Sequence, residues 1–234
     1  MSRRFLKRVA DATSSLTSIL TTRGDIPYKG SDGITRLPIG TSGQVLRGGT
    51  DPQWGTPGAG AWTFIQKKTP TATGKVDFVL PIATYNLFRL VAYNVRPATN
   101  GVEGYIRLST DGGVTFATGV SDYYWELQSV GAGITDAADS EIQLTETATT
   151  NTIGNAVNAG IAYMEAIISN AAVTGNSTSV SYTFYFHKQN DNAIRAVQGA
   201  GQTLLNRDDD AVRFLFSTGN ITSGTFILYG SVES

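Results

Sequence analysis

The spacing of hydrophobic residues divides the chain into three parts. Over residues 1–20 the apolar side chains recur at steps of four and three, over 21–61 they are sparse, and from Trp62 onward they tend to alternate with polar ones. Steps of four and three mark one face of a helix, whereas alternation is the period of a strand. We therefore expect a helical segment at 1–20, a stalk at 21–61 and a β domain at 62–234.

The first segment is expected to form a short helix that anchors the chain to another protein. Its apolar seam spans only two heptads, which is too short for an isolated helix to be stable in water. Such a helix forms against copies of itself or against a docking partner; a solvated terminus is the alternative. The residues predicted to make this anchor are Arg3, Arg4, Phe5, Lys7, Arg8, Val9, Leu16 and Ile19. Charges at 7, 8 and 11 interrupt the apolar run that a secretory signal requires.

The third segment has the pattern of an all-β domain. Short apolar or alternating runs are separated by turn residues throughout it, and no run has a convincing helical stripe. The pattern predicts an antiparallel β-sandwich, with a jelly roll as the first choice among sandwiches. The expected strands are residues 76–80, 87–93, 105–108, 114–116, 123–127, 141–144, 161–168, 180–186, 211–216 and 225–229.

Two of these strands carry more specific expectations. Residues 87–93 are almost wholly apolar, which predicts a strand buried on both faces. Residues 105–108 and 114–116 flank Asp111-Gly112-Gly113, which predicts a β-hairpin with positive φ angles at its turn.

The middle segment is rich in glycine and proline. Residues 24–60 hold ten glycines and four prolines in 37 positions, with isolated apolar side chains between them. Such a composition lacks the apolar mass to fold alone. We expect it to order when several copies wind together, with glycine allowing close approach. The apolar residues expected to meet in this trimeric stalk are Ile26, Ile34, Leu37, Ile39, Val45 and Leu46.

The sequence of this segment also resembles the shafts of tailed-bacteriophage fibre proteins. Those shafts often contain TT-(K/R)-GD followed by T-R-L-P-(I/V)-G-T-x-G-Q-V-L. The matching letters here are TTRGD at 21–25 and TRLPIGTSGQVL at 35–46, followed by the Trp54-Gly55 exit. Weaker similarity to domains attached to such shafts is carried by RLSTDGG at 107–113 and GNITSGTFILYG at 219–230.

This resemblance implies a structural protein of the virion, typically a homotrimer. Its N-terminus would dock on another virion protein, and its β domain would be displayed to bind a glycan or a protein of the host surface. The alternative is a capsid decoration protein, a cement protein or head fibre that stabilises the head without a receptor role. A carbohydrate-binding module of a secreted enzyme is a third class, disfavoured because no signal peptide is recognisable at 1–20.

Composition and charge exclude several other classes. Residues 62–234 carry ten basic against fifteen acidic residues, the wrong sign for neutralising nucleic-acid phosphates. No apolar run approaches the ~20 residues of a membrane-spanning helix, so no membrane insertion is expected. The chain has no cysteine, which excludes disulfides, zinc–thiolate sites and a cysteine nucleophile.

Candidate catalytic and metal-binding residues are few, and we predict no enzyme, metal or cofactor. His187 is the only histidine, and no Ser-His-Asp grouping is recognisable around it. Asp208-Asp209-Asp210 has oxygen ligands suited to Ca²⁺ but lacks the loop pattern, so a polar turn is the preferred interpretation. Scattered carboxylates leave a glycosidase acid pair as a minor alternative.

Two further motifs are interpreted structurally. Arg23-Gly24-Asp25 has the letters of a cell-adhesion signal but lies inside the shaft resemblance, where Gly-Asp is typical of a turn. Tyr123-Tyr124-Trp125 has rings suited to sugar stacking. In a strand, residues 123 and 125 share one face, and we expect that face to be core.

Overall fold

The computed structural model describes residues 18–55, 62–129, 132–146, 151–155, 162–171, 173, 175–189 and 193–232, with the backbone alone for 132–137. The chain divides into two compact units, Met1–Gly58 and Ala59–Ser234. Ser18 and Ile19 have helical backbone. The rest of the expected anchor, including Leu16, lies outside the described residues.

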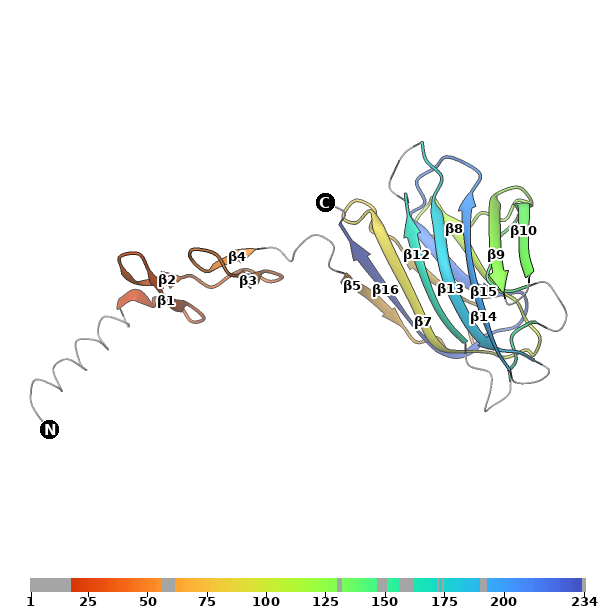
Figure 1. The fold of residues 1–234 in the computed structure, drawn as a ribbon, viewed down its shortest axis with the longest axis horizontal. Coiled ribbons are helices and arrows are strands. Elements are labelled where there is room, and N and C mark those ends of the chain that lie inside the picture. The colour runs from red at the N-terminus through yellow and green to blue at the C-terminus, as the bar shows by residue number, and fades with distance from the viewer. Residues whose placement is uncertain are drawn as a thin grey trace, which may run out of the picture. The chain divides into compact units, whose positions relative to one another are not determined.

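The first unit contains two small antiparallel hairpins (Figure 1). Strand β1 (Ile26–Gly30) pairs with β2 (Gly33–Leu37), and β3 (Val45–Arg47) pairs with β4 (Gln53–Gly55). No hydrophobic residue within 18–55 is buried.

The second unit contains two antiparallel sheets, with the larger one in front of β8 and β15 in Figure 1. The larger sheet has eight strands in the order β10-β9-β14-β13-β12-β7-β16-β5, and the smaller has four in the order β11-β8-β15-β6. The strands are β5 (Thr63–Lys68), β6 (Lys75–Val79), β7 (Leu87–Pro97), β8 (Gly104–Ser109), β9 (Tyr123–Ser129), β10 (Ala132–Asp139), β11 (Ile142–Gln143), β12 (Ala162–Ser169), β13 (Ser179–His187), β14 (Ile194–Thr203), β15 (Ala211–Phe216) and β16 (Ile221–Ser231).

Side chains from both sheets form one hydrophobic core. Phe214 of β15 in the smaller sheet packs on Phe226 of β16 in the larger one, with ring centroids 5.2 Å apart. Alternate residues along β12 and β13 are buried, as expected for strands with one face on a core. The layout is sandwich-like, and the prediction of a mainly β fold with antiparallel sheets is confirmed.

Two strand-level predictions are wrong. Strand β7 is buried on one face only, because Leu87, Arg89 and Val91 alternate with fully buried residues and lie on the outer face. Residues 114–116 form no strand, so the expected hairpin is absent; β8 pairs instead with β15 and β11. The turn itself has the expected geometry, with φ of 71° at Gly112 and 85° at Gly113.

The sequence pattern also missed strands, of which β14 is the clearest. Its residues IRAVQGAGQT lack the β-branched and aromatic content that marks a strand. Gly199 and Gly201 face the core, where Tyr182 and Ile142 occupy the space that their side chains would fill. The Tyr182 hydroxyl passes Gly199 and donates to the carbonyl oxygen of Gln143 in the smaller sheet. Glycine therefore serves packing at this point, not flexibility.

Candidate functional site

Residues 21–25, which match the shaft motif, form a closed turn around the side-chain carboxylate of Asp25. Asp25 Oδ2 accepts hydrogen bonds from the backbone N–H groups of Thr22 at 2.8 Å and Thr21 at 3.0 Å, and Oδ1 accepts one from Ile39 at 3.2 Å. The guanidinium of Arg36 lies 3.5 Å away, and the Asp25 side chain is only 1% exposed. The carboxylate thus ties the segment before β1 to the segment after β2.

The electrostatics of Asp25 agree with this structural role. Burial raises the pKa of its carboxyl, but the backbone N–H groups of Thr22, Ile39 and Thr21 and the charge of Arg36 together lower it by more. The net pKa lies below the ordinary value. A covered, fully bonded carboxylate is not available to an adhesion receptor, as expected for Gly-Asp in a turn.

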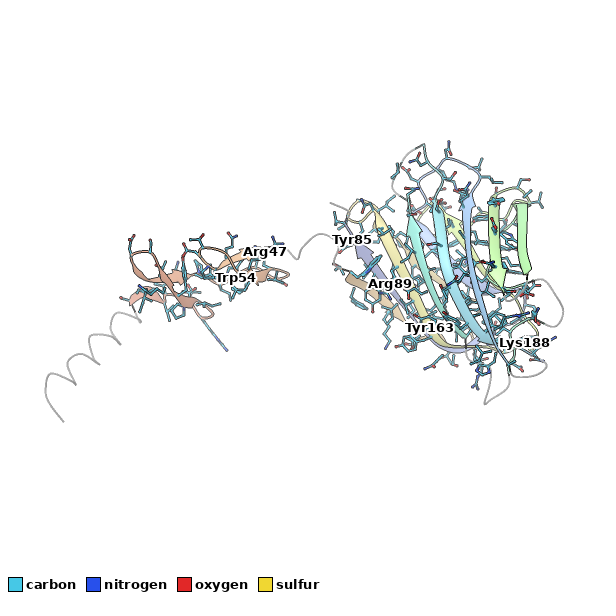
Figure 2. The ribbon with its side chains drawn as sticks, in the orientation of Figure 1. Arg47, Trp54, Tyr85, Arg89, Tyr163 and Lys188 are labelled. Carbon is cyan, nitrogen blue, oxygen red and sulfur yellow. The ribbon has the colours of Figure 1, made fainter. Side chains whose placement is uncertain are left out.

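Contacts between residues 38–46 and Trp54 hold the second hairpin. Trp54 Nε1 donates to the carbonyl oxygen of Pro38 at 2.6 Å, and the ring covers Gly40, where an added Cβ would lie 2.6 Å from Cδ2. The side-chain oxygen of Gln44 accepts from Thr41 N at 2.8 Å, while Gln44 N donates to Thr41 O at 3.1 Å. Trp54 and its neighbour Arg47 are labelled on this hairpin in Figure 2.

One expectation about this segment needs correction. We expected residues 21–61 to gain structure only when copies wind together. Both hairpins are present in the single chain, because side chains tie their ends to the flanking segments. Asp25 bonds Arg36 and the backbone of Ile39 around the first hairpin, and Trp54 of the second bonds the Pro38 carbonyl, while Gln44 closes the turn before β3. Polar and aromatic contacts thus replace the missing apolar core.

The hairpins leave their apolar side chains in solvent. Among the six expected stalk residues, Ile34, Ile39, Val45 and Leu46 are 53%, 55%, 43% and 51% exposed. The remaining two, Ile26 and Leu37, are half-buried and opposite each other across the hairpin. Four half-exposed aliphatic residues on so small a unit leave apolar side chains in water at several places, including both faces of β3. We call these four residues the stalk patch.

The two sequence candidates for chemistry in the β domain are His187 and Asp208-Asp209-Asp210. His187 is the last residue of β13 and pairs with Ile194, the first residue of β14. Within the described part of the chain, no three His, Cys, Asp or Glu residues converge as metal ligands do. Asp209 is buried and 2.9 Å from Arg207, and burial raises the pKa of its carboxyl. Asp210 instead accepts from Gly112 N at 2.8 Å, so the aspartates serve separate turns.

The aromatic residues of β9 point where the sequence predicted. Tyr123 and Trp125 are both buried in the core. Trp125 Nε1 donates to Asp139 at 2.8 Å, and the Tyr123 hydroxyl accepts from Leu108 N at 2.8 Å. Burial raises the pKa of Tyr123 to about 12. Neither ring is available for sugar stacking.

The outer face of the larger sheet carries a chain of contacts that sequence reasoning missed. Arg89 Nε on β7 lies 2.9 Å from Glu165 on β12, an ion pair whose N–H is not aligned as a hydrogen bond. The Tyr163 hydroxyl donates to the other oxygen of Glu165 at 3.1 Å. Tyr163 also packs against Tyr185 of β13, and Arg89 lies over the ring of Trp62. Figure 2 labels Arg89 and Tyr163 on this sheet.

The only sequence signal for this surface was alternation. Tyr163 and Glu165, like Tyr185, occupy the solvent-facing positions of strands predicted within two residues of their observed bounds. Nothing in the sequence indicated that these strands would be neighbours of β7, because Arg89 is 76 positions from Glu165.

Comparisons with known proteins return no match: no family model fits the chain, and no curated protein or solved structure is detectably similar to it. In the described part of the chain, no helix has the length and apolar character needed to cross a membrane.

Proposed function

We propose that the chain is a structural component of a tailed-phage virion. In this proposal it is a homotrimeric fibre or spike, docked by residues 1–20 on another virion protein, that displays its β domain for attachment to the host surface. The observation that supports the proposal is the stalk patch. Residues of the shaft-like motif form the hairpins that present it.

The patch supports self-association for a physical reason. Half-exposed aliphatic side chains gain about 25 cal/mol for each Å² of apolar surface removed from water. No hydrophobic residue among 18–55 is buried, so these residues do not provide this gain for one another. Identical copies supply identical patches, and a closed symmetric ring satisfies all of them at once.

The strand order of the β domain supports a jelly-roll-like sandwich. Strands β5-β16-β7-β12 and β6-β15-β8-β11 form two sets of four, between which the chain crosses repeatedly. This strand order matches that of an eight-stranded double-sheet jelly roll, which supports the proposed fold. The β9–β10 and β13–β14 hairpins extend the larger sheet beyond β12. A wide outer face of this kind is a suitable surface for display, although the same fold serves many functions.

The mass of the full-length protein tests self-association. Light scattering should give about three times the 24.9 kDa of one chain. The double variant Ile34→Asp/Ile39→Asp should shift the protein to monomer, because charge at a buried interface is costly. Thr35→Asp places one such charge on a neighbouring exposed position of β2 and should stay trimeric. A monomeric unmodified protein refutes the trimer.

Particles test the role in the virion. Soluble full-length protein should bind host cells and reduce phage adsorption. Deleting residues 1–20 should leave a soluble trimer that no longer joins particles, whereas incorporation at normal copy number refutes the anchor. If particles without the protein adsorb normally but have less stable heads, the protein is a decoration protein instead.

A further inference from the structure

The outer face of the larger sheet contains a shallow hollow of about 300 Å³. Its lining side chains are Glu165 and Ile167 on β12, Ser181 and Thr183 on β13, and Gln198 on β14. The hollow lies where β13 contributes the short side chains of Ser181 and Thr183 beside longer ones on β12 and Gln198 on β14; Ala200, opposite Ser181 on β14, is short as well. Its volume is at the lower end of the range for small-molecule sites.

Strand register places these residues in two rows. Glu165, Thr183 and Gln198 are direct cross-strand neighbours and form one row. Ile167 and Ser181 form the next row. Directly opposite side chains lie about 5 Å apart, so the rows present a carboxylate, hydroxyls and an amide over the span of one sugar ring.

Glu165 and its neighbours Tyr163 and Tyr185 are held by contacts with one another and with Arg89 before any ligand arrives. One carboxylate oxygen of Glu165 is paired with Arg89 and the other accepts from Tyr163. Tyr163 in turn packs against Tyr185, with ring centroids 6.1 Å apart and planes tilted by 35°. A site whose side chains are already ordered loses less conformational entropy on binding.

The chemistry of the lining selects the class of ligand. Hydroxyl, amide and carboxylate groups can exchange hydrogen bonds with several adjacent hydroxyls of a ligand. Tyr185, which is 41% exposed and lies two residues from Thr183 on the same face of β13, offers an aromatic face whose negative potential attracts polarised C–H groups. A ring that carries hydroxyls at its edge and C–H groups on its face is a pyranose.

The charges around the hollow limit further which class of sugar it can bind. The β domain has fifteen acidic against ten basic residues, and Glu165 lies in the wall of the hollow. The one cation that contacts this wall among the described residues, Arg89, is already paired with Glu165. Sialic acids, uronic acids and phosphorylated sugars would therefore have to compete with Glu165 for the guanidinium of Arg89.

We propose that this hollow binds a neutral hexose unit of a host-surface glycan. Tyr185 stacks on the C–H face of the sugar, Gln198 and Thr183 hydrogen-bond its hydroxyls, and Glu165 accepts from one of them. The inference rests on the proposed attachment function and names its ligand. Because the hollow is open and shallow, affinity at one site is weak, on the order of mM, and three sites on a trimer raise the avidity.

The test uses full-length protein and three simple probes: methyl glucoside, methyl galactoside and methyl mannoside. Saturation-transfer NMR should detect at least one of them, and titration should give its Kd. Tyr185→Ala and Gln198→Ala should each weaken binding about tenfold, and Ser181→Tyr should abolish it by filling the hollow. Phe64→Ala removes an exposed ring from the same face, three strands from β12, and should leave the Kd unchanged.

The possible outcomes distinguish failure of the proposed glycan site from failure of the proposed attachment function. Cell binding that survives periodate oxidation of host glycans and the Ser181→Tyr change overturns the glycan site but keeps attachment, with a protein receptor. Saccharide binding that responds to the hollow variants without cell binding keeps the site and overturns attachment. Equal binding of sialyllactose and lactose overturns the preference for neutral sugars.

Discussion

Residues 18–55 and the β domain are both antiparallel β structure, yet different forces hold them. The described part of the β domain has a shared hydrophobic core with thirty-two buried residues, including Phe88, Trp125 and Phe226. The hairpins of 18–55 have no buried hydrophobic residue and are closed by Asp25, Gln44 and Trp54. A two-stranded hairpin held by such contacts is only marginally stable by itself in water, whereas three or more strands with a hydrophobic face can make an independently stable domain.

The contrast explains the different consequences of exposure in the two units. In the β domain, exposed side chains lie on the outer surface of an already stable sandwich-like fold and are free to bind a ligand. In the hairpins, the exposed aliphatic residues are the only source of further burial. This contrast is the physical basis of the proposed self-association of the first unit; the β domain also has exposed apolar residues, such as Val114 and Ile194, but has a core without burying them.

The largest expected effect is loss of a core aromatic from the β domain. Phe214 is buried and packs on Phe216 and on Phe226 of the facing sheet. Phe214→Ala should lower the free energy of unfolding by about 3–5 kcal/mol, measured by urea denaturation. Val79→Ala, at an exposed position, should change it by less than about 0.5 kcal/mol. Equal effects would mean that the sheets do not share a core.

The next effect comes from crowding at a core-facing glycine. In Gly199→Ala the new Cβ would lie 2.8 Å from the Glu126 carbonyl oxygen and would press on the Tyr182 hydroxyl. We expect a loss of about 1–3 kcal/mol in unfolding free energy. Ala200→Val, at the adjacent outward position, should be nearly neutral.

A double-mutant cycle identifies the cause of this loss. Tyr182→Phe alone should cost about 0.5–1.5 kcal/mol, because the Gln143 carbonyl loses its donor. Combined with Gly199→Ala, it should cost less than the sum, since the clash with the hydroxyl is gone. Strict additivity would contradict the close packing of Tyr182 on Gly199.

In the hairpin unit, Trp54→Phe should have a smaller and purely local effect. It removes the hydrogen bond from Nε1 to the Pro38 carbonyl, worth about 0.5–1.5 kcal/mol. Amide exchange in β3 and β4 should accelerate by roughly 2- to 12-fold, the equivalent of that energy. Tyr28→Phe, a change of similar kind in the other hairpin, should leave β3–β4 exchange unchanged. A fall in the unfolding free energy of the β domain would contradict the separation of the two units.

The smallest effect at neutral pH is the titration of Asp25, which becomes visible only in acid. Its folded-state pKa is below the ordinary 3.8, so the carboxylate stabilises the first hairpin at every pH above that value. This stabilisation is lost as the pH falls from about 4 through the lowered pKa. The Ile39 amide should then exchange faster, and Asp25→Asn should remove the pH dependence.

Asp111 of the β domain provides an internal comparison in the same titration. Its pKa is lowered to about 2 by hydrogen bonds from the Thr115 side chain and backbone and from Ser109. Its carboxyl NMR signal should therefore titrate near pH 2. A pKa near 3.8 at either aspartate would show that the corresponding turn is open in solution.

Much of the β domain could be predicted because alternation is a local property. The expected strands at 211–216 and 225–229 overlap the observed β15 and β16, and burial of Tyr123 and Trp125 followed from the period of two. The hairpins of 21–55 could not be predicted in this way. Their turns are closed by side chains that lie far along the chain, such as Trp54 on Pro38, and no periodicity reveals such a pair.

The sequence by itself predicted three segments along the chain, the antiparallel β character of the last of them, and which side chains of a strand share a face. Only the tertiary structure decided the strand order, the outward placement of Arg89 and the core role of Gly199 and Gly201. The physical reason is range. Hydrophobic periodicity depends on neighbours one or two residues away, whereas the hollow at Glu165, Thr183 and Gln198 requires three strands to align in one register.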